Sequence, residues 1–336
     1  MMAALLDVRD LRVAIQTERG AVYPVQGASF TVDREETLCI VGESGCGKSV
    51  SMLAVLGLLG RARVEAERLH FTPTSEAPID LANCSQRELR RLRGRQIGLI
   101  FQDAAAAFNP VLPVGDQLAE PLRVHLGMSR GDAKRRAVQW LERVGIIDPA
   151  KRAKQYPHEF SGGMLQRAMI AMALICEPSL VIADEPTTAL DVSVQAEILD
   201  LLNDLKRTQQ IGLIMITHDL GVVAEIADSV TVMYAGQSVE RASKQSFFQS
   251  LKHPYSQALL ACTPNWKQGR ASIEPIPGAP PALDHIQTGC PFRFRCPHAW
   301  QRCEQMPPPF EANGHMARCW LLASDAGPNL DRLSRP

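Results

Sequence analysis

The sequence predicts an α/β fold in which a mostly parallel sheet carries helices on its faces. Short apolar runs that are typical of buried strands alternate with segments whose apolar residues recur at helical spacing. One apolar run, residues 38–41, leads into a glycine-rich segment, residues 42–49, and a helix-like segment follows directly. Because such sheets bind ligands where their strands end, the polar residues that follow the apolar runs are candidates for a functional site.

The apolar runs place the expected strands at residues 5–15, 22–32, 38–41, 97–101, 180–183, 213–217 and 229–234. Helices are expected after Ser49, over residues 115–150 with an amphipathic stretch at 133–144, from Ser161 to Cys176, and through Leu205. Ser161 is expected to cap its helix. The arginine-rich stretch at 87–95 is expected to be a solvated helix face. Tyr23, in the second strand, can stack on an adenine ring or be an ordinary strand aromatic.

The composition limits the classes of function. Of 336 residues, 46% are hydrophobic, which supports a proper core in one large domain with an appendage or in two domains. The formal net charge is 0 and the isoelectric point about 7.1, so no overall charge draws the chain to nucleic acid or anionic lipid. The sequence has no signal-peptide pattern and no apolar run of bilayer-spanning length. We therefore expect a cytosolic protein that meets membranes only through partners.

The glycine-rich segment has the form G-x-x-x-x-G-K-[ST], the pattern of a loop that binds nucleotide phosphates. Its glycines bring backbone N–H groups close to phosphate oxygens, and the following helix points its positive end at the same place. In this pattern the lysine reaches the β- and γ-phosphates, and the serine hydroxyl holds Mg²⁺. The alternative, a glycine-rich turn that binds nothing, is disfavoured because both flanks fit. The loop residues are Gly42, Glu43, Ser44, Gly45, Cys46, Gly47, Lys48 and Ser49.

Polar residues also stand at the ends of three other expected strands. Asp184 and Glu185 are adjacent carboxylates after a buried run, which is a costly placement without a function. Asp184 can hold Mg²⁺, usually through water, and Glu185 can polarise a nucleophilic water. Gln102 can reach the Mg²⁺ and that water, or it is simply a polar strand end. His218 follows the strand at 213–217.

In order along the chain, these motifs resemble those of ABC-type ATPases over roughly residues 5–265. The matching elements of that family are the phosphate loop, Q-loop (Gln102), signature (161–166), Walker B (180–185), D-loop (190–191) and H-loop (His218). The longer strings YPHEFSGGM, IADEPTTALDV and ITHDL look like the D-type ATPase subunit of dipeptide and oligopeptide importers. The HPY string at 253–255 points to the same subgroup.

The resemblance implies an ABC-type P-loop NTPase domain at residues 1–262, with a mixed sheet core and a helical subdomain at about 104–176. Two such domains would meet head to tail, so that each ATP lies between the phosphate loop of one chain and the signature of the other. Besides the phosphate loop, the implied nucleotide contacts are Tyr23, Gln102, Ser161, Gly162, Gly163, Gln166, Asp184 and Asp191. The implied Mg²⁺ contacts are Ser49, Gln102 and Asp184, and the implied catalytic residues are Glu185, His218 and Gln102.

The resemblance also implies partners, because the chain carries a single set of motifs. The second ATPase domain is usually a related F-type subunit, and the pair sits on two permease subunits at the cytoplasmic face of the bacterial inner membrane. An extracytoplasmic substrate-binding protein supplies cargo. The implied function is ATP-driven uptake of dipeptides or oligopeptides, although similar machines import nickel, haem or glutathione.

Two other classes of function are disfavoured. A soluble ABC ATPase acting on nucleic acid or ribosomes would have tandem ATPase domains or a long coiled-coil insertion, and the chain has neither. Its neutral charge also argues against a nucleic-acid partner. A non-hydrolytic assembly subunit would have a degraded Glu185 or signature, and both are intact.

One segment departs from the family pattern. Family members often read FQDPMTSLNP from the Q-loop onward, whereas residues 101–110 read FQDAAAAFNP. This segment faces the permease in the family. The coupling contacts or the partner can therefore differ, while the implied catalytic residues are unaffected.

The segment 263–336 differs in composition from the rest of the chain. Prolines mark an extended linker, and four cysteines follow, Cys290, Cys296, Cys303 and Cys319. Four thiolates suit a tetrahedral metal or an iron–sulfur cluster, and disulfides are disfavoured in cytosol. Zinc sites usually use tight C-x₂₋₄-C pairs, and these cysteines form none.

The importer subgroup carries such a tail and is associated with a [4Fe–4S] cluster, which is therefore the favoured prediction. Zinc and free structural cysteines are the alternatives. His298 and His315 are spare candidate ligands, although each is expected to be a surface or outer histidine.

Overall fold

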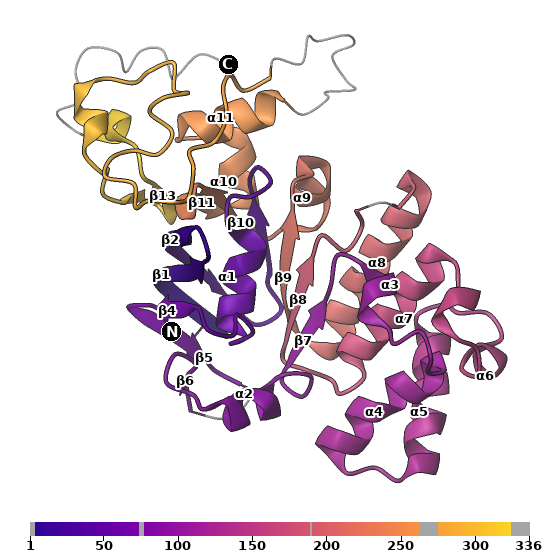
Figure 1. Ribbon diagram of the computed structural model, residues 1–336. Helices are drawn as coiled ribbons and strands as arrows, with labels where there is room; N and C mark the ends of the chain where they lie inside the picture. The colour runs from indigo at the N-terminus through magenta and orange to yellow at the C-terminus, as the bar shows by residue number, and fades with distance from the viewer. Residues whose placement is uncertain (1–3, 74–76, 189, 263–274, 324–336) are drawn as a thin grey trace. The chain divides into compact units, whose positions relative to one another are not determined.

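The computed structural model describes residues 4–73, 77–188, 190–262 and 275–323 (Figure 1). The chain divides into two compact units. The first contains the chain through Leu6, Val32–Thr37 and His70–Ile216, and the second contains Asp7–Thr31, Leu38–Leu69 and the chain from Thr217 onward. The expected linker begins at residue 263 and lies partly outside the described residues, so the domain boundary at residue 262 stays a prediction.

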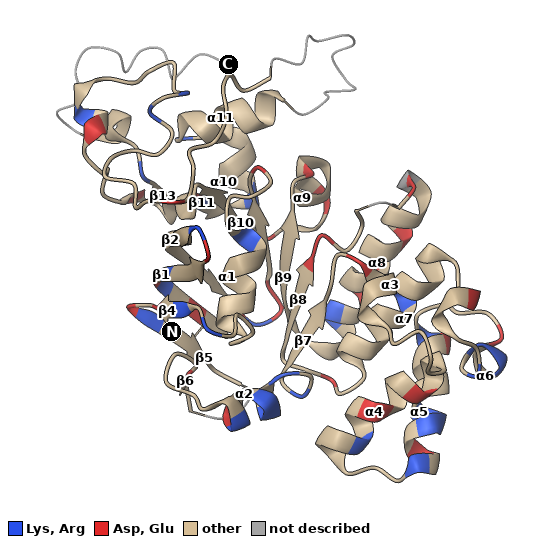
Figure 2. Ribbon diagram, in the orientation of Figure 1, with Lys and Arg blue, Asp and Glu red and all other residues tan. Residues whose placement is uncertain are grey.

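The first unit contains a parallel sheet in which β8 (Leu180–Asp184) pairs with β7 (Ile97–Ile100) and β9 (Gly212–Thr217). Ile182 and Ile214 are fully buried, as expected for strands covered on both faces. In Figure 2 these strands are tan over most of their length, with acidic colour at the carboxyl end of β8. The register pairs Ile100 with Ala183, so the residues that follow β7 and β8 emerge at the same edge of the sheet.

Helices make up most of the rest of the first unit. They are α2 (Gln86–Leu92), α3 (Ala104–Ala107), α4 (Val114–Leu126), α5 (Arg130–Arg143), α6 (Pro149–Arg152), α7 (Gly162–Leu174) and α8 (Val192–Gln209), with a 3₁₀ turn η1 (Pro157–Glu159). Helices α4 and α5 lie side by side (Figure 1). The helical stretch expected at 115–150 is broken by Gly127, which caps α4 in the left-handed region at φ 64°. Two short strands, β5 (Arg68–Phe71) and β6 (Ile79–Asp80), pair antiparallel.

The second unit has a mixed sheet. Strand β3 (Thr37–Val41) pairs in parallel with β10 (Ser229–Tyr234), which pairs antiparallel with β11 (Gln237–Ser243). Strand β11 meets β2 (Gly20–Val32) in parallel, and β1 (Leu6–Thr17) pairs antiparallel with β4 (Arg63–Glu65). Its helices are α1 (Lys48–Val55), α9 (Leu220–Ile226), α10 (Lys244–Gln249) and α11 (Pro254–Ala261).

The antiparallel pairs correct the expectation of a mostly parallel sheet for this unit. A two-residue loop joins β10 to β11, and both of its residues have positive φ, 46° at Ala235 and 79° at Gly236. Such a loop matches the twist of a hairpin and returns the chain directly alongside itself. The mixed sheet agrees with the fold that the family resemblance implies.

The C-terminal extension, defined as the described residues 275–323, adds strands to the second unit. Strand β13 (His315–Ala317) pairs antiparallel with β12 (Phe310–Ala312) and with β11. Two 3₁₀ turns, η2 (Gln301–Glu304) and η3 (Trp320–Leu322), complete the extension. The extension is therefore built onto the same sheet as the phosphate loop.

Within the described part of the chain, every helix is too short or too polar to cross a bilayer.

Candidate nucleotide site

The phosphate loop runs from β3 into α1, as the sequence predicts. Gly42 and Gly47 take positive φ values of 152° and 97°. A Cβ at Gly42 would lie 2.2 Å from the Met233 carbonyl oxygen, and one at Gly47 would lie 2.2 Å from the Pro24 carbonyl oxygen. Only glycine fits at these two positions, because both the backbone conformation and the space exclude a side chain.

Lys48 lies inside the loop with only 5% of its surface exposed. Its Nζ donates to the carbonyl oxygens of Gly42, at 2.7 Å, and of Glu43, at 3.0 Å. Burial raises the pKa of the neighbouring Cys46 thiol, although Lys48 opposes this rise, so the thiol is protonated near neutral pH. The loop therefore presents one buried cation, whose bonds to carbonyl oxygens can be exchanged for bonds to phosphate oxygens.

Glu185 follows β8 in a left-handed conformation, with φ at 46°. Its backbone N–H donates to the Ile216 carbonyl oxygen at 3.0 Å. Its Oε2 accepts hydrogen bonds from Gln102 Nε2, at 3.1 Å, and from the Thr188 hydroxyl, at 2.9 Å. A non-glycine residue held in this conformation at a strand end is characteristic of functional sites. The structure thus brings Gln102, Asp184 and Glu185 to one edge of the first unit.

The signature segment begins helix α7 in the first unit. The Ser161 Oγ accepts a hydrogen bond from the Met164 N–H at 3.3 Å, which confirms the predicted cap. A Cβ on Gly163 would lie 3.2 Å from Val194 Cγ1. Ser161 and Gly162 are exposed, so the amino end of a thirteen-residue helix faces solvent, where it can receive an anion.

Gln166 lies one turn further along α7 and is 96% buried. Its Nε2 has no hydrogen-bond partner among the described residues. A buried amide nitrogen without a hydrogen-bond partner is costly, and an acceptor atom of a bound molecule could satisfy it. This is consistent with the predicted contact between Gln166 and the nucleotide.

The remaining predicted residues lie at element ends or in the second unit. The Asp191 carboxylate caps α8 by accepting from the Val194 N–H at 2.9 Å. His218 is exposed directly after β9. Tyr23 is half-buried and lines a cavity of about 300 Å³ together with Arg12. The residue that follows Tyr23 is Pro24, whose carbonyl oxygen lies against Gly47 of the phosphate loop. The stacking of Tyr23 on a base stays a prediction.

Two side chains outside the predicted set contact Glu43 of the phosphate loop. Arg295 of the C-terminal extension forms a salt bridge with Glu43, and the Tyr255 hydroxyl accepts a hydrogen bond from the Glu43 N–H at 2.8 Å. The only sequence signal for either residue is the HPY string that contains Tyr255. No local pattern could have indicated Arg295, which lies 252 residues from its partner.

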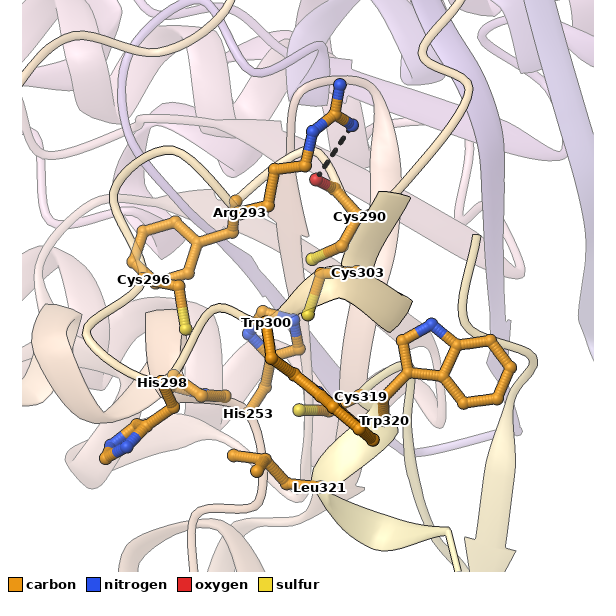
Figure 3. A pocket seen from close by; sticks show the side chains of 12 residues that line it. His253, Cys290, Arg293, Cys296, His298, Trp300, Cys303, Cys319, Trp320 and Leu321 are labelled. Atoms are coloured by element: carbon orange, nitrogen blue, oxygen red, sulfur yellow. Dashed lines mark hydrogen bonds between the residues drawn. The ribbon is translucent and has the colours of Figure 1, made fainter. Parts of the chain in front are cut away.

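The four cysteines of the extension line one cavity, and Figure 3 shows their sulfur atoms arranged around it. His298 and His253 line the same cavity. Burial raises the pKa of Cys290 to about 11 and that of Cys319 to about 12, so without a bound cation these thiols are protonated near neutral pH. Among the described residues, no group of three or more His, Cys, Asp or Glu side chains could hold a metal ion.

His315 does not lie at the surface, which corrects one expectation. It is only 2% exposed, and its Nε2 lies 2.7 Å from Oε1 of Glu240, which is fully buried. Its Nδ1 lies 2.8 Å from the Ser246 hydroxyl. Because hydrogen bonds occupy both ring nitrogens, His315 is not a ligand for a group in the cysteine cavity.

Solved structures share this fold. MJ0796, a bacterial ABC transporter cassette, matches with a TM-score of 0.62 at 23% identity, over 71% of this chain and 98% of its own. CbiO1 from Clostridium perfringens, part of the ABC transporter complex cbiONQ, matches with a TM-score of 0.59 at 26% identity, over 74% and 91%. Residues 25–188 match the family model described as ABC transporter. The fold and the phosphate loop therefore define an ABC-type ATPase.

More similar relatives identify the particular family. The dipeptide transport ATP-binding protein DppD of Bacillus subtilis is 46% identical over 324 residues, 95% of either chain. The oligopeptide transport ATP-binding protein OppD of Salmonella typhimurium is 49% identical over 304 residues, 90% of this chain and 89% of its own. Residues 239–303 match the model for the oligopeptide/dipeptide transporter C-terminal region. The chain belongs to this family of transport ATP-binding subunits, and its activity is ATP hydrolysis coupled to transport.

Proposed function

We propose that this ATPase energises the import of dipeptides or oligopeptides. The observation that carries the proposal is the similarity to DppD and OppD, which extends over nearly the whole of both chains and includes the C-terminal region. The names of these relatives do not favour nickel, haem or glutathione as the cargo. The permease and binding protein would select among peptides.

The phosphate loop would hold the triphosphate in the second unit. Lys48 would exchange its bonds to the Gly42 and Glu43 carbonyl oxygens for bonds to the β- and γ-phosphates. Mg²⁺, held by Ser49, Asp184 and Gln102, would neutralise charge that develops on the transferred phosphoryl group. The amides of the loop and the amino end of α1 supply further positive potential.

Glu185 would act as the general base that takes a proton from the attacking water. The Gln102 amide and the Thr188 hydroxyl donate to its Oε2, so two hydrogen bonds orient the carboxylate. His218 would hold the γ-phosphate in line. The signature residues Ser161 and Gly163 would approach the ATP of a second chain, because an exposed helix amino end attracts an anion.

The chain would work with partners. A second ATPase, an F-type paralogue, would complete each nucleotide site, and two permease subunits would dock on the pair at the inner-membrane face. Exposed apolar side chains lie on both sides of Gln102 in the sequence, with 43% of Phe101, 73% of Val111 and 43% of Leu112 open to solvent. Such a group of apolar residues suits burial against a permease. A binding protein outside the membrane would deliver the peptide.

The cysteine cavity would hold a [4Fe–4S] cluster, with zinc as the alternative. The chemistry of the donors supports this, since four thiols line one cavity. Binding would require that the four thiols lose their protons.

Reconstitution tests the proposal. The chain would be co-expressed with two permease subunits and an F-type ATPase subunit from the same organism, placed in lipid vesicles and supplied with a peptide-binding protein. Uptake of a labelled dipeptide or oligopeptide that requires MgATP is the expected result. Uptake of nickel, haem or glutathione but not of peptides would overturn the assigned cargo.

A further inference from the structure

The phosphate loop is joined to the C-terminal extension by a nearly buried ion pair. Arg295 Nη1 donates to Glu43 Oε2 at 2.7 Å, and Nη2 donates to Oε1 at 2.9 Å. The exposed fractions of the two side chains are 5% and 26%. A two-point contact between a guanidinium and a carboxylate fixes orientation as well as distance.

The guanidinium is held on its other sides as well. Its Nε donates to the Pro277 carbonyl oxygen at 2.8 Å, and Nη2 donates to the Ile276 carbonyl oxygen at 3.3 Å. Nη1 also donates to the Tyr234 hydroxyl at 3.2 Å. With the two bonds to Glu43, this makes five hydrogen bonds for the five N–H groups of an arginine. Arg295 is therefore a fixed cation rather than a mobile surface side chain.

Glu43 is restrained through its backbone as well. Its N–H donates to the hydroxyl of Tyr255, which is fully buried and packs against Tyr234 with ring centroids 4.5 Å apart. Phe292 of the extension packs on both tyrosines. The position of the second residue of the phosphate loop is thus set by α11 and by the extension together.

We propose that Arg295 is a positioning residue for nucleotide binding, which acts on the phosphate loop through Glu43. The proposal rests on the proposed role of this loop in holding ATP. A carboxylate within a phosphate-binding loop repels a triphosphate, and a paired guanidinium cancels that charge. The two-point contact with Arg295 also fixes the orientation of the Glu43 side chain.

The extension therefore takes part in nucleotide binding instead of being an independent appendage. Arg295 directly precedes Cys296, and its backbone N–H donates to the Phe292 carbonyl oxygen at 2.9 Å, within the turn that follows Cys290. The same turn thus supplies residues to the cysteine cavity and the cation to the phosphate loop.

A double-mutant cycle on MgATP affinity tests the proposal. The dissociation constant would be measured for the full-length wild type, Arg295→Gln, Glu43→Gln and the double variant. Arg295→Gln should weaken MgATP binding roughly tenfold, the factor that a coupling of about 1.4 kcal/mol gives. The same change in the Glu43→Gln background should have little effect, because no unpaired carboxylate remains to repel the phosphates.

The matched control is Arg241→Gln. Arg241 also joins the sheet to the extension, through Glu311 at 3.8 Å, but its partner lies in β12 and not in the phosphate loop. The variant Arg241→Gln should therefore have an MgATP affinity within about twofold of that of the wild type. If Arg295→Gln does not fold, Arg295→Lys serves instead, because it keeps the charge and loses the two-point contact.

Two results would overturn the proposal: unchanged MgATP affinity in folded Arg295 variants, or an equal loss of affinity with and without the Glu43 carboxylate. The second result would mean that Arg295 only supports the fold. A wild type that fails to bind MgATP would instead overturn the proposed function of the loop, so the two failures are distinguishable.

Discussion

The side-chain amide of Gln102 donates a hydrogen bond to the carboxylate of Glu185 across 3.1 Å, although 83 residues separate them in sequence. The strand register explains the contact, because Ile100 of β7 pairs with Ala183 of β8 and each polar residue lies two positions further on. Gln102 is thus more than a polar strand end. It orients the carboxylate to which we assign the proton transfer, and a second donor, Thr188, holds the same oxygen.

Replacing Glu185 with glutamine should abolish ATP hydrolysis while ATP still binds. The amide keeps the size of the side chain but cannot accept a proton from water at neutral pH. Loss of a positioned general base costs roughly 100-fold or more in rate. The measurement is phosphate release at saturating MgATP, together with the dissociation constant of ATP.

Glu177→Gln is a suitable control for this variant. Glu177 is an exposed glutamate with positive φ whose carboxylate pairs with Arg136, so it shares the charge and conformation of Glu185 without the site. Its hydrolysis rate should match that of the wild type. Retention of more than about a tenth of the wild-type rate in Glu185→Gln would rule out the assigned role.

Alanine at Gly47 should destabilise the fold far more than alanine at Gly45. Both glycines have positive φ, 97° and 78°, so both changes carry the left-handed strain of about 1 kcal/mol. A Cβ at Gly47 would also lie 2.2 Å from the Pro24 carbonyl oxygen, whereas nothing lies within 4 Å of a Cβ at Gly45. We expect a loss of about 3 kcal/mol for Gly47→Ala and about 1 kcal/mol for Gly45→Ala in urea unfolding. Equal losses would show that the backbone strain alone matters.

The parts of the site that a local pattern encodes could be predicted from the sequence. The phosphate loop has a fixed spacing of glycine, lysine and serine, and the strand that delivers Asp184 was expected at 180–183 and is found at Leu180–Asp184. The Ser161 cap was expected because serine before an apolar helix has a local hydrogen-bonding use. Each of these features depends on residues within a few positions of one another.

Features that depend on distant pairing could not be predicted. Strand β13 has three residues, too few to show the alternation of a strand, and it forms because β11 and β12 pair with it. His315 is buried against its hydrogen-bond partner Glu240, which lies 75 residues earlier in the sequence, so no local pattern indicates the contact. The contact between Arg295 and Glu43 also joins residues that are distant in the sequence, and neither residue is unusual in its local sequence.

Glu240→Gln should destabilise the second unit at neutral pH by about 2 kcal/mol, because hydrogen bonds to a buried charged group are lost or weakened. Burial by itself would raise the pKa of Glu240, but the hydrogen bonds from His315 and from the backbone of Lys252 and His253 lower it below the ordinary value of 4.5. A lowered carboxyl pKa stabilises the fold above pH 4.5, and that stabilisation is lost as the pH falls through the lowered value.

The difference in unfolding free energy between wild type and Glu240→Gln should therefore be constant from pH 7 to pH 5 and shrink below pH 4.5. Chemical unfolding at a series of pH values measures it. A difference that grows on acidification would mean that the carboxylate is already protonated in the native state near neutral pH.

Purification without oxygen should give a brown protein with four irons per chain, if the cysteine cavity holds the proposed cluster. Cys303→Ser should remove most of the iron and the visible absorption, because Cys303 is buried and lines the cavity with the other three cysteines. Cys84→Ser is the matched control, since Cys84 lies in the first unit and is not a lining residue. It should keep the full iron content. A colourless wild type with one zinc per chain would establish the alternative metal, and a metal-free wild type with four reactive thiols would show that the cysteines are structural.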